Sequence, residues 1–272
     1  MSRSCVETEI QMTAIRSFSA VAFAAAVTVA VPATTAQAAD DYGASAPPGI
    51  EFELGAAANV APRYEGASEM LVTPVPLIKI NRLTLPNGFQ IGGRDRGGLS
   101  VSPSFNVRGA RKSADTPALT GLSDVDLAIE FGAEISYEAE YFRLHANLRR
   151  GFGGHEGWAG EAGADLIVRP MEGLRVSAGP RISYADNRYM DTYFSVPAGT
   201  AGFAAFNADG GIKSYGVGVG LRQDFDNSWA IIGEAGYDRL TGDAGSSPVT
   251  AVGSRDQFSV RLGVVRKFRF DF

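Results

Sequence analysis

Apolar and polar side chains alternate with a period of two over most of the chain after residue 50. In the clearest segment, 125–137, Val125, Leu127 and Ile129 begin an apolar series that alternates with acidic residues, glycine and serine. Such a period places successive side chains on opposite faces of a β-strand and predicts an all-β fold. Similar alternation occurs at 174–184, 215–222 and 257–272, and shorter or less regular runs lie at 50–60, 70–80, 83–92, 99–109, 140–150, 158–169 and 228–241.

The length of these runs separates two kinds of β-fold. Strands of soluble β-sandwiches average about five or six residues, whereas a tilted strand needs ~9–11 residues to cross the core of a bilayer. Several runs here are longer than that, and aromatic residues lie near their ends, as in interfacial girdles. We therefore expect a closed antiparallel transmembrane β-barrel over 40–272, with a secreted β-sandwich as the alternative. The girdle candidates are Tyr137, Trp158, Tyr184, Trp229 and Tyr237.

The connections between the runs bear on the number of strands. Turns near 138–140, 170–173 and 226–228 are short, whereas 187–209 and 242–255 are long and rich in Gly, Ser and Pro. Short periplasmic turns and long outer loops are typical of bacterial barrels, which have an even number of strands. Since eleven runs are visible, we expect twelve strands, with ten as the alternative, and place the miscounted strand before residue 110.

A short apolar segment precedes the first run. Arg16 is followed by uncharged small and apolar residues, and Ala36-Gln37-Ala38 has the small-residue pattern of a signal peptidase site. We expect residues 1–39 to be a signal peptide that is cleaved after Ala38 or Ala39. A first transmembrane helix is the alternative, and Pro32 argues against it.

Composition excludes several classes of function. The chain has 272 residues with Lys+Arg 25 and Asp+Glu 30, and this acidic balance argues against nucleic-acid binding. With Cys 1, which is Cys5 in the segment expected to be removed, a disulfide framework is excluded, and with His 2 the composition argues against a thiolate or imidazole metal cluster, which needs three or four ligands. The high glycine content, Gly 33, falls mainly on the polar face of the runs, where small residues fit a narrow lumen. Met12 is a second candidate start besides Met1.

Charged residues of both signs lie on the polar face of consecutive runs. Acidic residues on one run and basic residues on the next can pair across the ladder. They either fill and close a small barrel or form the charge rings of a narrow selective channel. We favour a mostly occluded interior. The candidate lumen charges are Glu130, Glu134, Arg143, Arg149, Glu161, Asp165, Arg175 and Arg181.

The two histidines do not form a catalytic pattern. His155-Glu156 has no second histidine at i+4 and no third ligand nearby, so the pattern of zinc proteases fails and we interpret the pair as loop polarity. His145 alternates with polar residues, and we interpret it as an interior hydrogen-bonding group rather than a proton-sensitive pore residue. The glycine-rich run 216–220 lies inside a predicted strand with no helix after it, unlike a dinucleotide-binding loop.

Three aspartates between 186 and 209 could offer oxygen ligands to calcium. Their spacing is not that of an EF-hand loop, and we interpret Asp186, Asp191 and Asp209 as part of a solvated outer loop. We therefore expect no catalytic activity, no cofactor and no metal site.

Five segments together are similar to the MipA/OmpV family of outer-membrane proteins, and the resemblance covers essentially the whole mature chain. Residues 81–99 are shorter than in typical members. The C-terminal Phe268, Phe270 and Phe272 resemble the aromatic signal for barrel insertion, although Arg269-Phe270-Asp271-Phe272 departs slightly from the family ending. The segments are 61–66, 121–126, 151–157, 179–196 and 253–258, and the most specific loop residues are Asp186, Arg188, Tyr189, Met190, Thr192, Tyr193 and Phe194.

The resemblance implies an outer-membrane scaffold of Gram-negative bacteria rather than an enzyme. The founding member is described as the partner of a membrane-bound lytic transglycosylase, which it links to a murein synthase in peptidoglycan biosynthesis. Other members are described as antigens, adhesins or osmotic-response proteins. The expected partners are thus outer-membrane lipid, the barrel assembly machinery, a lytic transglycosylase and a murein synthase, with contacts through periplasmic turns or segment 40–50. A narrow channel or a surface adhesin is the alternative.

Overall fold

A computed structural model describes residues 47–92, 98–225 and 228–272, all within the compact unit Ser45–Phe272. The expected signal peptide, its cleavage site and most of segment 40–50 lie outside the described residues. None of the described helices is long and apolar enough to cross a membrane.

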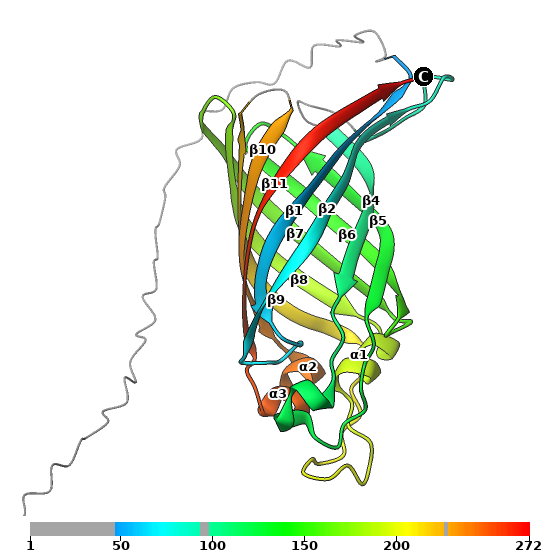
Figure 1. The fold of residues 1–272 in the computed structure, drawn as a ribbon, viewed down its shortest axis with the longest axis vertical. Helices are drawn as coiled ribbons and strands as arrows, with labels where there is room; N and C mark the ends of the chain where they lie inside the picture. Colours follow the sequence, from blue (N-terminus) through cyan, green and yellow to red (C-terminus); the bar gives the residue numbers. More distant parts are fainter. Residues whose placement is uncertain (1–46, 93–97, 226–227) are drawn as a thin grey trace, which may run out of the picture. The chain divides into compact units, whose positions relative to one another are not determined.

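The described strands form one antiparallel sheet that is rolled into a barrel (Figure 1). Consecutive strands are neighbours, and β1 also pairs with β11, from Gly49↔Asp271 to Val60↔Val260. The first and last strands are therefore joined in the wall, and the expected barrel is confirmed. The strands are β1 (Gly49–Pro62), β2 (Met70–Thr84), β3 (Gln90–Gly92), β4 (Gly98–Arg108), β5 (Ala128–Glu138), β6 (Phe142–Gly153), β7 (Trp158–Met171), β8 (Leu174–Ala185), β9 (Gly211–Asp224), β10 (Trp229–Leu240) and β11 (Asp256–Asp271).

The expectation of twelve strands is not met within the described residues. Ten strands are long, and β3 has 3 residues, so the alternative of ten strands fits the barrel wall. The difference arises before residue 110, where the run at 83–92 is not a separate long strand but comprises the end of β2, a turn and the short β3. A register shift between Glu51 and Phe52 of β1 lets β2 continue to Thr84, and only β3 pairs with its end.

At one place in the described barrel wall, neighbouring strand edges are not hydrogen-bonded to each other. The sheet order runs β3-β2-β1-β11-β10-β9-β8-β7-β6-β5-β4, so among the described residues β4 has no ladder with β2 or β3. We call the facing edges of 70–81 in β2 and 98–108 in β4 the β2–β4 seam. The barrel is therefore nearly closed rather than hydrogen-bonded all the way round.

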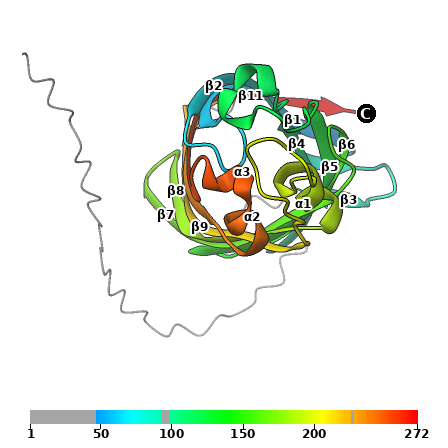
Figure 2. The same ribbon diagram turned by 90° about the horizontal axis from the view of Figure 1, so that it is seen from below.

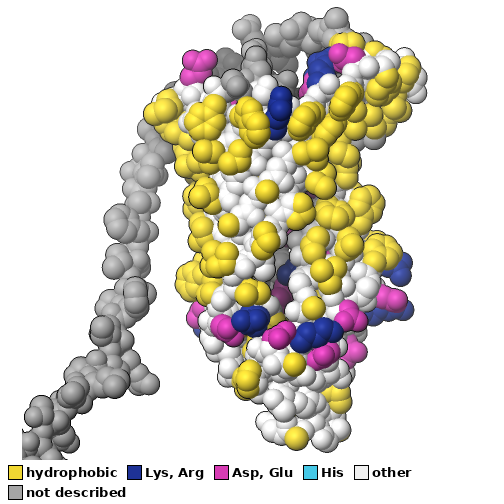
Figure 3. Space-filling model, in the orientation of Figure 1, with side chains coloured by type: hydrophobic (Ala, Val, Ile, Leu, Met, Phe, Trp, Pro, Cys, Tyr) yellow, Lys and Arg dark blue, Asp and Glu magenta, His cyan; other side chains and the backbone are white. Residues whose placement is uncertain are grey.

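Alternation gives the wall an apolar outer face and a polar inner face. In β5 the side chains of Ile129, Phe131 and Ile135 are exposed on the outside, whereas Glu130 and Glu134 point inward. Figure 3 shows hydrophobic side chains over the wall, with charged side chains at its lower edge. An apolar outer surface of this extent is stable in a bilayer but not in water.

The two ends of the barrel differ. The turns β5–β6, β7–β8 and β9–β10 are short and lie at the end that carries the C-terminus, which is the periplasmic end of bacterial barrels (Figure 1). The opposite, outer end carries the long connections and all the described helices. These are η1 (Ser113–Asp115), η2 (Pro117–Leu119), α1 (Asn187–Phe194), α2 (Gly242–Ser246) and α3 (Pro248–Ala251).

Candidate functional site at the outer end of the barrel

Two long connections fold over the outer mouth of the barrel. We call residues 186–210, with α1, and 241–255, with α2 and α3, the plug. Figure 2 shows these helices gathered within the ring of strands. Their apolar side chains form two buried clusters, one around Met190 and Phe194 and one in which Val196 and Val249 pack with Leu119 and Leu122 of the connection between β4 and β5. The plug is thus packed like a small protein core rather than lying as solvated loops.

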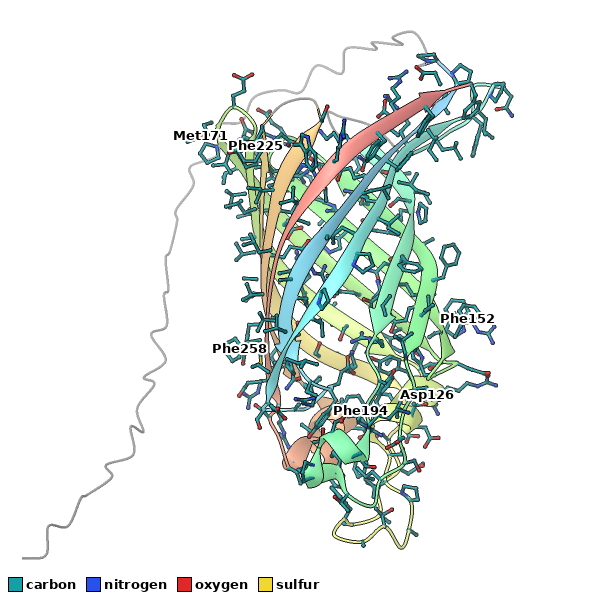
Figure 4. The ribbon with its side chains drawn as sticks, in the orientation of Figure 1. Asp126, Phe152, Met171, Phe194, Phe225 and Phe258 are labelled. Atoms are coloured by element: carbon teal, nitrogen blue, oxygen red, sulfur yellow. The ribbon has the colours of Figure 1, made fainter. Side chains whose placement is uncertain are left out.

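Helix α1 brings the most specific family residues into this core. Asp186 caps the helix by accepting a hydrogen bond of 2.9 Å from the backbone N–H of Tyr189. Tyr189, Met190, Tyr193 and Phe194 are buried, and Figure 4 shows Phe194 among the outer loops. Arg188 and Thr192 lie on the other side of the helix, where Thr192 donates a hydrogen bond to the Arg188 carbonyl at 2.8 Å. The four buried side chains of α1 thus depart from the expected solvated outer loop, whereas much of the rest of 186–210, including Asp191 and Asp209, is exposed.

His155 lies beneath α1. Its imidazole is 2% exposed and makes edge contacts with the rings of Tyr189 and Tyr193, at centroid distances of 4.8 and 5.5 Å. Gly151 leaves room for it, because a Cβ at that position would lie 2.1 Å from His155 Cε1. Interpreting His155 as loop polarity was wrong, since the segment after β6 turns into the barrel.

A buried carboxylate holds the charges below the plug. Glu130 has no exposed surface, and Arg108 Nε and Arg149 Nε donate to its two oxygens at 2.9 and 3.1 Å. Asn106 Nδ2 donates to the same carboxylate at 2.9 Å, and His155 Nε2 lies 3.3 Å away without the alignment of a hydrogen bond. Arg108 also reaches a second carboxylate.

That second carboxylate is Glu65, from the connection between β1 and β2. Glu65 Oε1 accepts a hydrogen bond from Arg108 Nη1 at 2.8 Å and another from Lys213 Nζ. Lys213 reaches it because a register shift in the β8–β9 ladder turns both Lys213 and Ser214 inward. The resulting cluster of Glu65, Arg108, Glu130 and Lys213 joins the β1–β2 connection to β4, β5 and β9, and Lys213 Nζ lies 3.5 Å from the Tyr189 hydroxyl of the plug.

Burial and charge fix the protonation of the groups outside the strands. Burial by itself would raise the pKa of Glu65, but the charges of Lys213 and Arg108 outweigh it, and the pKa lies below its ordinary value. Burial raises the pKa of Tyr193 to about 12 and raises that of Tyr189 well above its ordinary value. At neutral pH the β1–β2 connection therefore presents a charged carboxylate and the plug presents two neutral phenols.

The C-terminal end of α1 is fastened by two side chains from other connections. Arg111 is buried, and its Nη1 donates to the Tyr193 carbonyl at 2.8 Å. Ser247 donates to the Phe194 carbonyl at 2.6 Å. These contacts satisfy carbonyl groups that a helix end leaves free.

The segments that carry the family resemblance meet in and around the plug. Gly66 of 61–66 contacts the last segment, because its carbonyl accepts from the Ser254 N–H at 2.7 Å. Leu122 packs in the apolar cluster with Val196, and His155 packs against α1. Segments that are far apart in sequence thus build one feature of the fold.

The eight candidate lumen charges lie on inward positions of β5 to β8, and pairs form among them. Arg143 Nη2 is 2.5 Å from Glu134, Arg181 Nη2 is 2.6 Å from Asp165, and Arg149 binds Glu130 as described. Glu161 lies 3.9 Å from both Arg181 and His145. Arg175 of β8 pairs with Glu138 of β5, at 2.9 Å, rather than with an acidic residue of an adjacent strand.

Glycines on the inner face make room for Arg181. A Cβ at Gly163 would lie 2.8 Å from Arg181 Cδ and Nη1, and one at Gly218 would lie 3.3 Å from Nη2. The Arg181 side chain therefore lies against Gly163 of β7 and Gly218 of β9, and its guanidinium pairs with Asp165 of β7. This is the inner-face role that the glycine content suggested.

The C-terminal aromatic residues lie on the outer face near the periplasmic end. Phe52 of β1 stacks on Phe268 and Phe270, with centroid distances of 5.5 and 5.8 Å, and Phe272 is exposed. Arg266 covers the rings of Trp229 and Phe268, at 5.5 and 5.3 Å from their centroids. This group forms an aromatic band at one edge of the lipid-facing wall.

The three aspartates considered as calcium ligands have separate roles. Asp186 caps α1, Asp191 lines a surface hollow of about 310 Å³, and Asp209 donates its backbone N–H to Asp243 at 2.8 Å. Within the described ranges no group of acidic, histidine or cysteine side chains is arranged to hold a metal ion.

Sequence reasoning missed most of the charge cluster. Arg108, Lys213 and Glu65 were not singled out, nor was Glu53, which binds Arg222 through two hydrogen bonds of 2.8 and 3.0 Å. Glu65 lies in one of the family-like segments, which was the available signal. Lys213 breaks the alternation of β9, and such a break can be recognised in sequence as a bulge.

Comparison with known proteins agrees with this architecture. The family described as MltA-interacting protein MipA matches residues 54–268. No curated protein sequence matches the chain.

Solved outer-membrane proteins are similar to the chain at low sequence identity and with TM-scores below 0.5. An outer membrane channel from Pseudomonas putida F1 is 15% identical, with a TM-score of 0.45, and the match covers 85% of this chain and 99% of that chain. The N-terminal β-barrel domain of Pseudomonas aeruginosa OprF is 15% identical, with a TM-score of 0.31, over 64% of this chain and 100% of that chain. OprG from Pseudomonas aeruginosa is 10% identical, with a TM-score of 0.27, over 82% and 97%.

The family match extends over most of the chain, from the first strand to the last. It confirms the resemblance and the location in the outer membrane. This protein is therefore an outer-membrane β-barrel that belongs to the MipA family.

Proposed function

We propose that the barrel is an outer-membrane anchor that holds a murein-degrading lytic transglycosylase, and through it a murein synthase, at the periplasmic face. The observation that carries this proposal is the packed plug, because a barrel closed at its outer mouth serves better as a platform than as a pore. The name of the family, MltA-interacting protein, points to the same kind of partner.

The periplasmic turns offer a surface for such a partner. Each described turn at that end carries a large apolar side chain that is exposed: Phe89, Tyr141, Met171 and Phe225. Figure 4 shows Met171 and Phe225 at the tips of neighbouring turns, pointing away from the barrel. Exposed aromatic residues and methionine are typical of protein interfaces, and some of these side chains also reach the lipid interface.

Retention of the enzyme on immobilised barrel tests the proposal. The protein is fixed through an outer-loop tag in detergent micelles and exposed to a purified membrane-bound lytic transglycosylase from the same bacterium. We expect retention, and we expect Met171→Asp with Phe225→Asp to abolish it because charge at the turn tips disfavours apolar contact. Val252→Asp, at an exposed apolar site on the outer end, is the matched control and should leave retention unchanged.

A narrow channel is the second candidate. It is supported by inward charges that remain partly exposed, such as Glu161 and the pair Glu234 and Arg261. Planar bilayers distinguish the two functions: steady single-channel conductance whose ion selectivity changes in Glu134→Ala or Arg175→Ala supports the channel. Such conductance without retention of the transglycosylase would overturn the scaffold proposal.

A further inference from the structure

The β2–β4 seam lies between strands whose facing edges carry proline. Pro74 and Pro76 lie near the middle of β2, and Pro103 lies at the middle of β4. Proline has no backbone N–H, so it cannot donate to a neighbouring strand. Whether these prolines matter for the seam depends on which way their backbone groups point.

Hydrogen bonds at the adjacent turns fix that direction. In an antiparallel ladder every second pair of opposite residues is hydrogen-bonded. Arg63 and Glu69 form such a pair, because Arg63 N donates to the Glu69 carbonyl at 2.9 Å. Counting in steps of two along β1 and β2 from this pair, Ala57↔Val75 is also hydrogen-bonded. Pro74 and Pro76 therefore occupy the alternate pairs, whose backbone groups turn away from β1 and toward the seam.

The same reasoning applies to β4. Ala139 N donates to the Phe142 carbonyl at 2.8 Å, so steps of two place Ala133 in a pair that is bonded to β6. In the β4–β5 ladder Ala133 lies opposite Pro103, and this pair is not hydrogen-bonded. The backbone groups of Pro103 therefore also point toward the seam. Both edges of the seam therefore lack backbone donors at their prolines.

Proline elsewhere in the wall has the same local effect. Pro180 lies within β8, and the β7–β8 ladder is interrupted there, between Gly163↔Arg181 and Leu166↔Ala178. The interruption at Pro180 is short because its neighbours continue the ladder, whereas three prolines on two facing edges prevent a ladder from forming. An unpaired N–H in hydrocarbon costs several kcal/mol, so the loss of these donors makes an open seam less costly.

The lumen beside the seam is apolar on one side. The inward positions of β2 include Leu71, Val75 and Leu77, in contrast to the charged and serine-rich inner faces of β4 and β5. Leu77 lies against β11 and β1, because a Cβ at Gly263 would lie 2.9 Å from Leu77 Cδ1 and 2.7 Å from Ala57 Cβ. The outward side chains Val72 and Ile78 are also apolar and exposed. Between Leu71 and Leu77 the inner face of β2 is interrupted only by Thr73, and Lys79 and Asn81 follow it, so an apolar path runs from the outer face of this part of β2 to its inner face.

We propose that the β2–β4 seam is a lateral binding site for an acyl chain of a membrane lipid, which enters the lumen and lies against Leu71, Val75 and Leu77. An acyl chain needs no hydrogen-bond donors from the edges, whereas an added β-strand would need those that Pro74, Pro76 and Pro103 lack. The charges of β5 and β6 are paired with one another, Arg143 with Glu134 and Arg149 with Glu130.

Quenching by brominated lipid tests this site. Single-cysteine variants in a Cys5→Ser background carry a small fluorophore at Val75→Cys, on the inner face of β2, and are reconstituted in vesicles of phospholipid with or without dibrominated acyl chains. Val72→Cys, on the outer face of the same strand, reports full contact with lipid. Ser177→Cys, on the inner face of β8, is the matched lumen control away from the seam.

We expect the Val75→Cys label to lose a fraction of its fluorescence close to that at Val72→Cys, while the Ser177→Cys label loses little. Pro74→Val, Pro76→Val and Pro103→Val together restore the donors and should reduce quenching at Val75→Cys. The heat-dependent shift in SDS gels verifies folding, and Pro103→Val alone replaces the triple variant if that does not fold. A Val75→Cys label that is quenched no more than the Ser177→Cys label would overturn the proposal, and so would quenching that a folded proline variant leaves unchanged.

Discussion

Glu130 carries a negative charge where water does not reach. Its carboxylate is bound by Arg108, Arg149 and Asn106, so its removal leaves two guanidinium groups without their partner. Breaking a buried ion pair on one side costs about 3–5 kcal/mol. We expect Glu130→Ala to lower the free energy of unfolding by that amount, as measured by urea unfolding in lipid vesicles.

Glu234 provides the control for this prediction. It forms a single ion pair with Arg261 at 3.1 Å on the same inner surface, but its side chain is 54% exposed. Exposed ion pairs contribute less than about 1 kcal/mol, so Glu234→Ala should change the unfolding free energy little. Equal losses in the two variants would contradict the importance of burial.

Gly151 is a second residue at which a small change should affect stability, because there is no room for a Cβ atom. A methyl group there would lie 2.1 Å from the His155 ring, so the ring must move or the strand must shift. Overpacking of this kind costs about 1–3 kcal/mol, and we expect Gly151→Ala to destabilise the protein and expose the 186–210 connection to protease. Gly109→Ala is the control, because nothing lies within 4 Å of that Cβ position and its stability and cleavage should match the wild type.

At the scale of the element, α1 depends on its N-terminal cap. Loss of an N-cap side chain costs about 1 kcal/mol, which is large for a helix of 8 residues. We expect Asp186→Ala to speed amide hydrogen exchange throughout α1. Asp191→Ala removes the same charge inside the same helix without removing the cap, and exchange as fast in that variant would refute the capping role.

The connection between β1 and β2 makes the attachment of the plug depend on pH. The pKa of Glu65 is lowered in the folded protein, so its ion pairs stabilise the plug above the ordinary pKa of glutamate and are lost as the pH falls through the lowered value. We expect the mobility of a spin label at Val252→Cys to rise once the pH falls below about 4.

Glu65→Gln identifies the group that causes the rise. In that variant the label should already be mobile at neutral pH and should respond less to acid. A rise of the same size at the same pH in Glu65→Gln would assign the effect to other carboxylates.

Individual elements show how far the sequence predicted the structure. Strands such as β5 and β11 were predicted with their inward and outward faces because alternation is a local property of the chain. β2 and β3 were miscounted because the shift between Glu51 and Phe52 depends on the partner strand.

The site was predicted less completely for a similar reason. The inward charges of β5 to β8 follow from alternation, but the burial of His155 and Tyr189 follows from how the connections fold over the mouth. That packing joins residues far apart in sequence, so the local alternation of apolar and polar residues does not predict it. Only the family-like segments, which meet there, gave an indication.

At the scale of the whole molecule, the plug and the wall together determine what passes through the barrel. With the plug in place we expect little or no conductance in planar bilayers. Tyr189→Ala combined with Tyr193→Ala removes the rings that pack on His155 and should produce frequent openings. Tyr237→Ala removes an aromatic ring that packs on Phe258 and should leave the conductance at the wild-type level. Large, steady conductance of the unaltered protein would show that the plug does not close the mouth.

The pairing of β1 with β11 also has a consequence for the order of the chain. Gly49 lies opposite Asp271, so the first and last strands end side by side and a few added residues would connect them. The barrel can then be cut at Glu172-Gly173, in the short turn between β7 and β8, to give a circularly permuted chain with the same strand neighbours. In that chain the aromatic strand β11 becomes internal. The contribution of Phe268 and Phe270 to the finished wall can then be measured apart from any effect of their place in the last strand.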